Sequence, residues 1–313
     1  MTRLARISAA VATGAALFAA SAAMASDLGP LVTPSELNAE IDTLDPVLLD
    51  IRTGSYEKGH IDGAVYAPYS LFRGPDNNPG QVPPIAKLQA SFEQIGLEPD
   101  RPIVIIAQGD TDTDFGAAAR VYWTLKSTGF TDLSILNGGT TAWANAGLPM
   151  SDVTENLMPT DLDLTWNDRW TAETPAVSDV VNGKGKAVLV DARPPAFFEG
   201  KKAHSAASRP GTLPGAENLP YTKFFRSGAT VIDAKTDAAA LKEQLGIKDG
   251  EEVVSFCNTG HWAATDWFAM SELAGIENVK LYPGSMVEYS QTDGEMANTP
   301  GLLQNLLNQL TGG

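Results

Sequence analysis

Short runs of apolar residues alternate with amphipathic segments through most of the chain. Apolar runs of this length predict strands that are buried on both faces, as in a parallel sheet. Between them, apolar residues at helical spacing predict helices that cover the sheet. The predicted strands are 47–49, 103–107, 133–136, 187–190, 253–256 and 279–282, and the predicted helices include 35–41, 85–95 and 117–127. This alternation predicts an α/β fold, in which each mainly parallel sheet carries helices on both faces.

The same pattern occurs twice along the chain, which indicates two copies of one domain. Asp50 and Arg52, after the first strand, correspond to Asp191 and Arg193 in the second half. Farther on, 117–143 parallels 263–289 at a constant offset. We therefore predict an N-terminal domain at 27–150, a linker at 151–170 and a C-terminal domain at 171–313.

The two ends of the chain have patterns of their own. Residues 1–25 combine Arg3 and Arg6 with an alanine-rich apolar run and an Ala23-Met24-Ala25 site. These features are typical of a secretory signal peptide, so we expect cleavage after Ala25 and a periplasmic protein. No later segment has the 18 or so consecutive apolar residues of a membrane span. Leucines at helical spacing between 302 and 310 predict a C-terminal helix.

Charge and cysteine content narrow the function. The chain has 38 acidic and 22 basic residues and a formal net charge of −16, which argues against nucleic acid and anionic membrane surfaces as partners. A single cysteine, Cys257, excludes an intramolecular disulfide. In an exported protein, a lone thiol is either buried and inert or reactive.

The surroundings of Cys257 favour reactivity. The cysteine follows the predicted strand 253–256, so it lies at the carboxyl edge of the sheet, where α/β proteins bind ligands. Gly260 lets the following loop curl, and its backbone N–H groups can point at the sulfur. Such an environment lowers a thiol pKa from about 8.5 to roughly 3.5–7.5 and yields a nucleophilic thiolate. The predicted anion-binding loop is Asn258, Thr259, Gly260, His261, Trp262 and Ala263.

Several motifs in order resemble one family. They are Asp-x-Arg after a strand, Gly-His-Ile-x-Gly-Ala at 59–64, Asn-Gly-Gly at 137–139, Cys-x-x-Gly at 257–260 and Gly-Ser-x-x-Glu-Tyr at 284–289. Together they resemble the rhodanese-like sulfurtransferases. The tandem arrangement resembles the thiosulfate and 3-mercaptopyruvate sulfurtransferases, in which a cysteine-free domain precedes the catalytic one. The resemblance implies two tandem rhodanese-like domains and a persulfide at Cys257.

The resemblance also implies substrates and partners. The expected donor is a small sulfur anion such as thiosulfate, and the expected acceptor is a thiol or cyanide. No metal or organic cofactor is expected. A periplasmic sulfur-relay protein is the expected protein partner. A carrier that holds sulfur without turnover, or a redox-sensing or binding protein of sulfur metabolism, is the alternative that steady-state assays separate from an enzyme.

The chain departs from the family at its cations. Many relatives place Arg or Lys in the catalytic loop, where this chain has none, and a further Arg where this chain has Phe197. A protonated His261 can supply charge, Thr259 can donate a hydroxyl, and Trp262 can line the pocket or pack. The other candidates for binding the donor are Arg193, Lys201, Lys202, His204 and Arg209. The alternatives are a solvated loop at 200–211 and structural ion pairs of Arg193 with Asp191 and of Arg52 with Asp50.

Two further hypotheses are weaker. Asp110, Asp112 and Asp114 suggest a calcium loop, but the glycine and glutamate of an EF-hand are missing, so a solvated acidic loop is preferred. In this first copy, Gly109 or Asp110 is expected to stand where the second copy has its cysteine. A cysteine phosphatase needs an arginine to close its loop. Ala263 occupies that position.

Overall fold

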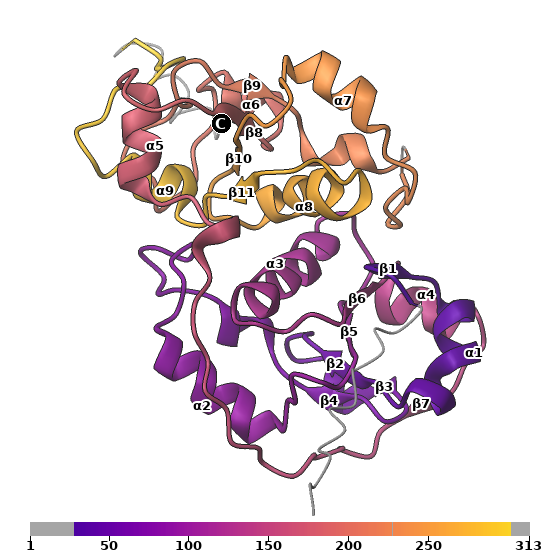
Figure 1. Cartoon of the computed structure of the whole chain (residues 1–313). Helices are drawn as coiled ribbons and strands as arrows, with labels where there is room; N and C mark the ends of the chain where they lie inside the picture. Colours follow the sequence, from indigo (N-terminus) through magenta and orange to yellow (C-terminus); the bar gives the residue numbers. More distant parts are fainter. Residues whose placement is uncertain (1–27, 227, 302–313) are drawn as a thin grey trace, which may run out of the picture.

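The computed structural model describes residues 28–226 and 228–301, which form two α/β domains that pack against each other (Figure 1). The predicted signal peptide and the predicted helix at 302–310 lie outside the described residues. Within the described ranges, no helix combines the length and the apolar character that a membrane span requires. The predicted α/β class with parallel sheets is confirmed.

The N-terminal domain is built on a parallel sheet with strand order β1-β6-β5-β2-β4. Every residue of β2, β5 and β6 is buried, which explains why their sequences are mainly apolar, with only Asp50 and Ser134 as polar exceptions. The strands are β1 (Leu31–Val32), β2 (Val47–Asp50), β4 (Val65–Tyr66), β5 (Ile103–Ile106) and β6 (Leu133–Leu136), and β3 (His60–Ile61) pairs antiparallel with β7 (Met150–Ser151). The helices are α1 (Pro34–Leu44), α2 (Ile85–Ile95), α3 (Asp114–Ser127) and α4 (Gly139–Asn145), with short 3₁₀ turns at Tyr56–Lys58 and Tyr69–Phe72.

The C-terminal domain repeats the plan with strand order β11-β10-β8-β9, again all parallel. Its strands are β8 (Val188–Asp191), β9 (Glu217–Asn218), β10 (Val253–Phe256) and β11 (Val279–Leu281). Its helices are α5 (Thr174–Val181), α6 (Pro195–Phe198), α7 (Ala238–Leu245), α8 (Trp262–Phe268) and α9 (Ser285–Tyr289), with 3₁₀ turns at Asp168–Trp170 and Tyr221–Phe224 and a π-helical turn at Ala269–Leu273. The central β8–β10 pair places Asp191 beside Phe256, immediately before the cysteine.

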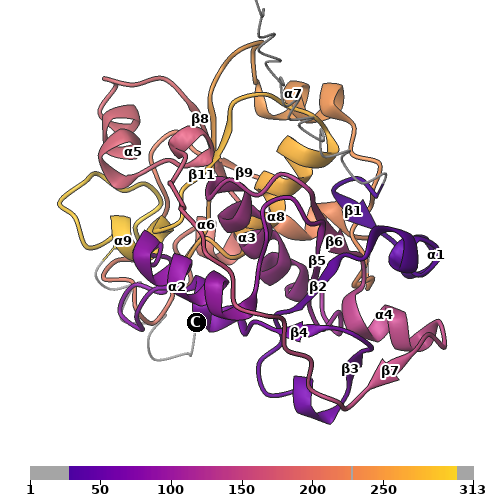
Figure 2. The same cartoon turned by 60° about the horizontal axis from the view of Figure 1, so that its bottom comes forward.

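The two domains meet along α3 and α8, which lie side by side in both views (Figures 1 and 2). Phe268 of α8 packs edge-on against Phe115 and Tyr122 of α3, with ring centroids 5.4 and 5.1 Å apart. Such aromatic pairs contribute roughly 0.5–1.5 kcal/mol each beyond their buried area. Lys126 of α3 forms an ion pair with Glu272 at 2.7 Å. One apolar cluster runs through both domains, so their junction is a packed core.

Candidate active site

Cys257 directly follows β10 and opens the loop that leads into α8. It is 1% exposed and lies within the apolar cluster that joins the two domains. The loop turns at Gly260, where φ is +65°, a conformation that side chains rarely adopt. A Cβ at this position would lie 2.5 Å from Arg120 Nη1 and 2.6 Å from the carbonyl oxygen of Pro283, so only glycine fits here.

The first domain has the same strand-to-loop junction without a thiol. An N–H of α9 donates to the carbonyl of Cys257 at 3.1 Å, and the equivalent N–H of α4 donates to the carbonyl of Ala107 at 3.0 Å. Ala107 is therefore the counterpart of Cys257, and the prediction of Gly109 or Asp110 was wrong. The loop between β5 and α3 is longer than the loop between β10 and α8, and its extra residues follow Ala107. An alignment of the two helices therefore places Gly109 or Asp110, instead of Ala107, opposite Cys257.

Ser285 supports the loop of Cys257 through hydrogen bonds to its backbone. Its hydroxyl accepts the backbone N–H of Cys257 at 3.0 Å and that of Gly260 at 3.2 Å, and donates to the carbonyl of Tyr282 at 2.7 Å. Ser285 has φ +52°, whereas Gly139 at the equivalent start of α4 has +57°. The hydrogen bonds that its hydroxyl accepts from two buried N–H groups offset the strain of this backbone conformation.

The remaining loop amides are free. Within residues 28–226 and 228–301, five backbone N–H groups of this loop have no hydrogen-bond partner. They belong to Asn258, Thr259, His261, Trp262 and Ala263. Buried N–H groups are normally paired, so a row of free donors in the loop that follows the thiol suits an anion.

His261 faces the N-terminal domain rather than a donor. Its Nε2 donates to the carbonyl of Thr113 at 2.8 Å, and its Nδ1 accepts the hydroxyl of Tyr69 at 2.9 Å. Burial, and then the charge of Arg73, lowers the pKa of His261 to about 4. The imidazole is therefore neutral at neutral pH, which contradicts the expectation that it supplies a positive charge.

Trp262 packs at the same junction. Its indole N–H donates to the hydroxyl of Thr113 at 2.8 Å. The ring stacks on Tyr221 at 5.2 Å and meets the edge of Phe197 at 5.9 Å. Phe197, where the resemblance implied an arginine, thus belongs to an aromatic cluster beside the catalytic loop.

Arg193 is a structural residue. It is 2% exposed and forms an ion pair with Asp191 at 2.6 Å. Its Nη2 also donates to the carbonyl of Gly211, and its Nη1 donates to the side chain of Asn258. The first domain repeats this ion pair between Arg52 and Asp50. Because four of its five side-chain N–H groups donate within its own domain, the geometry favours the structural alternative for Arg193 over donor binding.

The inserted stretch 200–211 contributes little free charge. Arg209 is held by the carbonyls of Ser290, Thr292 and Gly294, so its role is to tie this stretch to the end of α9. Lys201 is exposed and paired with Glu199, and Lys202 is also exposed. The Nδ1 of His204 accepts a backbone N–H, and burial, followed by Arg73, lowers its pKa. The structure therefore gives Lys201, His204 and Arg209 other partners than a donor.

Two arginines that the sequence did not single out face the catalytic loop from the other domain. Arg120 of α3 is fully buried and contacts the loop at Gly260. Arg73 lies over the ring of Tyr69 at 5.3 Å. Its charge acts on Arg120, His204 and His261, so these groups surround one region.

The acidic loop 110–114 is organised by hydrogen bonds. Asp114 accepts the N–H groups of Asp110 and Thr111, and Asp112 accepts the hydroxyl of Tyr221 in the other domain. The loop thus helps to join the two domains.

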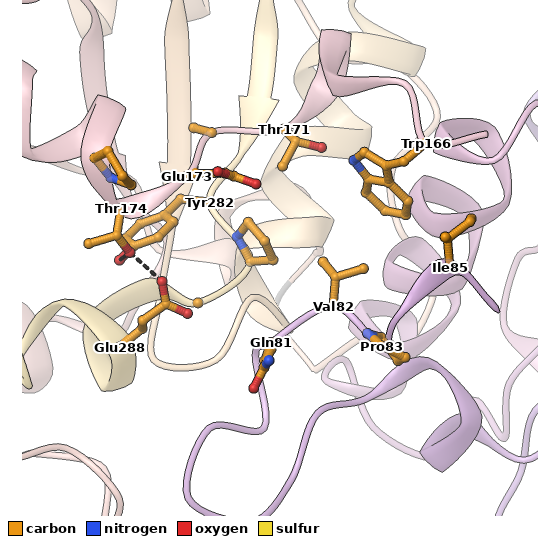
Figure 3. Close-up of a pocket in the computed structure, with 14 residues that line it drawn as sticks. Gln81, Val82, Pro83, Ile85, Trp166, Thr171, Glu173, Thr174, Tyr282 and Glu288 are labelled. Carbon is orange, nitrogen blue, oxygen red and sulfur yellow. Dashed lines mark hydrogen bonds between the residues drawn. The ribbon is translucent and has the colours of Figure 1, made fainter. Parts of the chain in front are cut away.

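A cavity of about 410 Å³ is lined by residues of both domains (Figure 3). Val82 and Ile85 enter it from the N-terminal domain, and Glu173 and Glu288 from the C-terminal domain. Its lining includes no Lys, Arg, His or Cys. With two carboxylates and no cation, this cavity does not suit an anionic donor.

Comparisons with known proteins agree with this arrangement. A family profile described as "Rhodanese-like domain" matches residues 33–146 and 177–292. The chain is 30% identical to a thiosulfate sulfurtransferase of Pseudomonas aeruginosa, over 88% of this chain and 97% of that protein. It is 28% identical to a Thermus thermophilus sulfur carrier protein, over 65% of this chain and 73% of the other. The crystal structure of Escherichia coli SseA, described as a 3-mercaptopyruvate sulfotransferase, superposes with a TM-score of 0.70 at 23% identity, over 82% and 98% of the two chains. The chain therefore belongs to the rhodanese-like family, with one such domain in each half.

Proposed function

We propose that this protein is a sulfurtransferase that takes the outer sulfur of thiosulfate, or of a similar small anion, onto Cys257. The observation that carries the proposal is the single thiol of the chain, which follows β10 and opens a loop with a row of free backbone N–H groups. Such preorganised donors stabilise an anionic sulfur in the thiolate, in the transition state and in the persulfide. The names of the thiosulfate sulfurtransferase relatives support the same chemistry.

The proposed reaction has two steps. Cys257 Sγ attacks the outer sulfur of thiosulfate, a new S–S bond forms, and the S–S bond of thiosulfate breaks with its electron pair on the departing sulfite. A thiolate or cyanide then attacks the outer sulfur of the persulfide and carries it away, and the Cys257 thiolate is regenerated. This is covalent, ping-pong catalysis. Because the cysteine is 1% exposed, the site favours a donor of a few atoms over a bulky one.

Intact-mass measurement tests the first step. Wild type incubated with thiosulfate should gain the mass of one sulfur atom, and the Cys257→Ser variant should gain none. Addition of cyanide should return the wild-type mass and release thiocyanate. If wild type gains no mass, or if Cys257→Ser gains as much, the proposal is wrong.

The sulfur carrier relative keeps a second function open. A carrier would accept one sulfur per chain from thiosulfate but would not turn over with cyanide at steady state. We favour the enzyme because relatives named thiosulfate sulfurtransferase match 88% and 86% of this chain, whereas the carrier matches 65%. We place the reaction in the periplasm on the signal-like sequence of residues 1–25.

A further inference from the structure

Arg120 presents unpaired donors to the catalytic loop. The side chain is fully buried, and only its Nη2 finds an acceptor, the carbonyl of Gly80 at 2.8 Å. Its Nε and Nη1 have no hydrogen-bond partner. Nη1 is the atom that lies 2.5 Å from a Cβ placed on Gly260. Burial of a guanidinium with two nitrogens that lack acceptors costs folding free energy unless an anion accepts their hydrogen bonds.

Arg73 adds a second charge in the same region. Its Nη1 is also buried without a partner, and its guanidinium lies over Tyr69, whose hydroxyl bonds to His261 of the catalytic loop. Neither Arg73 nor Arg120 forms an ion pair with any carboxylate in the described part of the chain. In a chain with 38 acidic residues, two neighbouring arginines without a carboxylate partner call for another source of negative charge.

Cys257 supplies only part of that charge. Its thiolate and later its persulfide each carry one negative charge, whereas thiosulfate and sulfite each carry two. The negative charge of Cys257 acts directly on Arg120 and on Tyr69, which places both groups within its field. Within the described residues, the arginines of the catalytic domain nearest the insertion and β8 are tied to that domain: Arg193 to Asp191 and the carbonyl of Gly211, and Arg209 to the carbonyls of Ser290, Thr292 and Gly294.

We infer that Arg73 and Arg120 form a subsite for the oxygen atoms of an oxyanion donor, so that the cysteine-free domain binds the donor for the cysteine-bearing one. This inference rests on the proposed sulfur transfer at Cys257 and adds where the donor is held. The planar guanidinium groups match the spacing of sulfonate oxygens. They hold the sulfite half of thiosulfate while Sγ attacks the outer sulfur, and they stabilise sulfite as it leaves.

Reagents of graded charge test the subsite. Thiosulfate carries two charges, methanethiosulfonate carries one, and methyl methanethiosulfonate carries none but still reacts with an accessible thiolate. The first two transfer a sulfur and release sulfite or methanesulfinate, and the third transfers a methylthio group and releases methanesulfinate. Rates are measured by intact mass on wild type, Arg73→Gln, Arg120→Lys and Arg169→Gln. Arg169 is exposed and stacks on Trp170, so its variant removes the same charge away from the site.

Arg73→Gln should react with thiosulfate roughly 10- to 100-fold more slowly than wild type, the range of one charged hydrogen bond. Its rate with methyl methanethiosulfonate should change less than about threefold, and methanethiosulfonate should fall between the two. Arg169→Gln should match wild type throughout. In a Cys257→Ser background, Arg73→Gln should also weaken sulfite binding measured by calorimetry, and this readout needs no chemistry.

Two results would overturn the subsite and leave sulfur transfer intact. One is an Arg73→Gln protein that matches wild type with thiosulfate. The other is a loss that is equal for all three reagents, which would mean that the arginine acts on the thiol or on the fold. Arg120→Lys keeps a charge but loses the fork, so it should lose selectivity for thiosulfate over methyl methanethiosulfonate, and unchanged selectivity would remove Arg120 from the subsite. A wild type that gains no sulfur from thiosulfate would instead refute the proposed function.

Discussion

His261 links the catalytic loop to the N-terminal domain, and its protonation should weaken that link. The carbonyl of Thr113 can only accept a hydrogen bond, so the Nε2 of His261 carries the proton and Nδ1 is left to accept from Tyr69. Both nitrogens of the neutral ring are thus satisfied. Burial, and then the charge of Arg73, holds the pKa at about 4.

The pH window follows from the two pKa values. A histidine in the unfolded chain titrates near 6.5, whereas this one titrates at about 4 when folded. Above pH 6.5 both states are neutral, and His261 adds no pH dependence. As pH falls, the unfolded chain takes up a proton that the folded chain refuses, so stability falls until about pH 4. The full difference is about 3 kcal/mol, of which about 2 kcal/mol is lost by pH 5.

Urea unfolding of wild type and His261→Gln at pH 7.5 and pH 5 measures this loss. A glutamine amide can donate to Thr113 and accept from Tyr69, but it does not titrate. We expect wild type to lose about 2 kcal/mol more than the variant between the two pH values. The other two histidines are present in both proteins, so their contributions cancel. Equal losses would show that His261 is charged or solvent-accessible in the folded protein and would refute the assignment.

Three further substitutions probe the loop and the helix behind it. Ser285→Gly relieves the strained backbone but removes the acceptor of two amides, so persulfide formation should slow at least tenfold with little loss of stability. Ser285→Ala keeps the strain, so it should lose both rate and stability. An unchanged rate in mass-monitored kinetics would count against Ser285 as a support of the loop. Gly260→Ala should unfold at lower urea and react poorly, because a Cβ there overlaps Arg120, and a variant with wild-type values would contradict that contact. Burial, and then the negative charges of Cys257 and Asp191, raises the pKa of Asp266 well above its usual range, so Asp266→Asn should be more stable than wild type at pH 7, with the difference shrinking toward pH 4; urea melts showing no difference at pH 7 would contradict this.

The central strands could be predicted because burial on both faces leaves an apolar run in the sequence. The predicted bounds 133–136 and 253–256 coincide with β6 and β10, and 85–95 coincides with α2. The two-residue strands, such as β3 and β7, leave no such pattern, because their pairing depends on the chain that passes beside them. The π-helical turn after α8 likewise has no signal in local periodicity.

The thiol could be located from sequence, whereas the charges around it could not. Cys257 follows an apolar run and precedes a glycine loop, and both are local features. Local features therefore predict cations only near that loop and in the insertion, where Arg209 is tied to backbone carbonyls. Arg73 and Arg120 lie in the other domain, and they reach the loop only because α3 packs on α8. The available signal in the sequence was Arg120 among the small and apolar residues of 115–123, since a basic side chain in such a segment needs a partner when the helix is buried.

The two copies share a scaffold and divide the chemistry. Both have the Asp-x-Arg ion pair and the N–H that holds the first residue after the central strand. They differ where that residue is Ala107 or Cys257, and where the helix that supports it begins with glycine or serine. If the arginines sat in the catalytic domain, that domain could bind an anion alone. Because they sit in the other domain, an oxyanion donor meets the thiol and the cations together only while the α3–α8 junction is closed. Donor binding should therefore stabilise the junction as well as the loop, since a ligand that touches both domains favours their packed state.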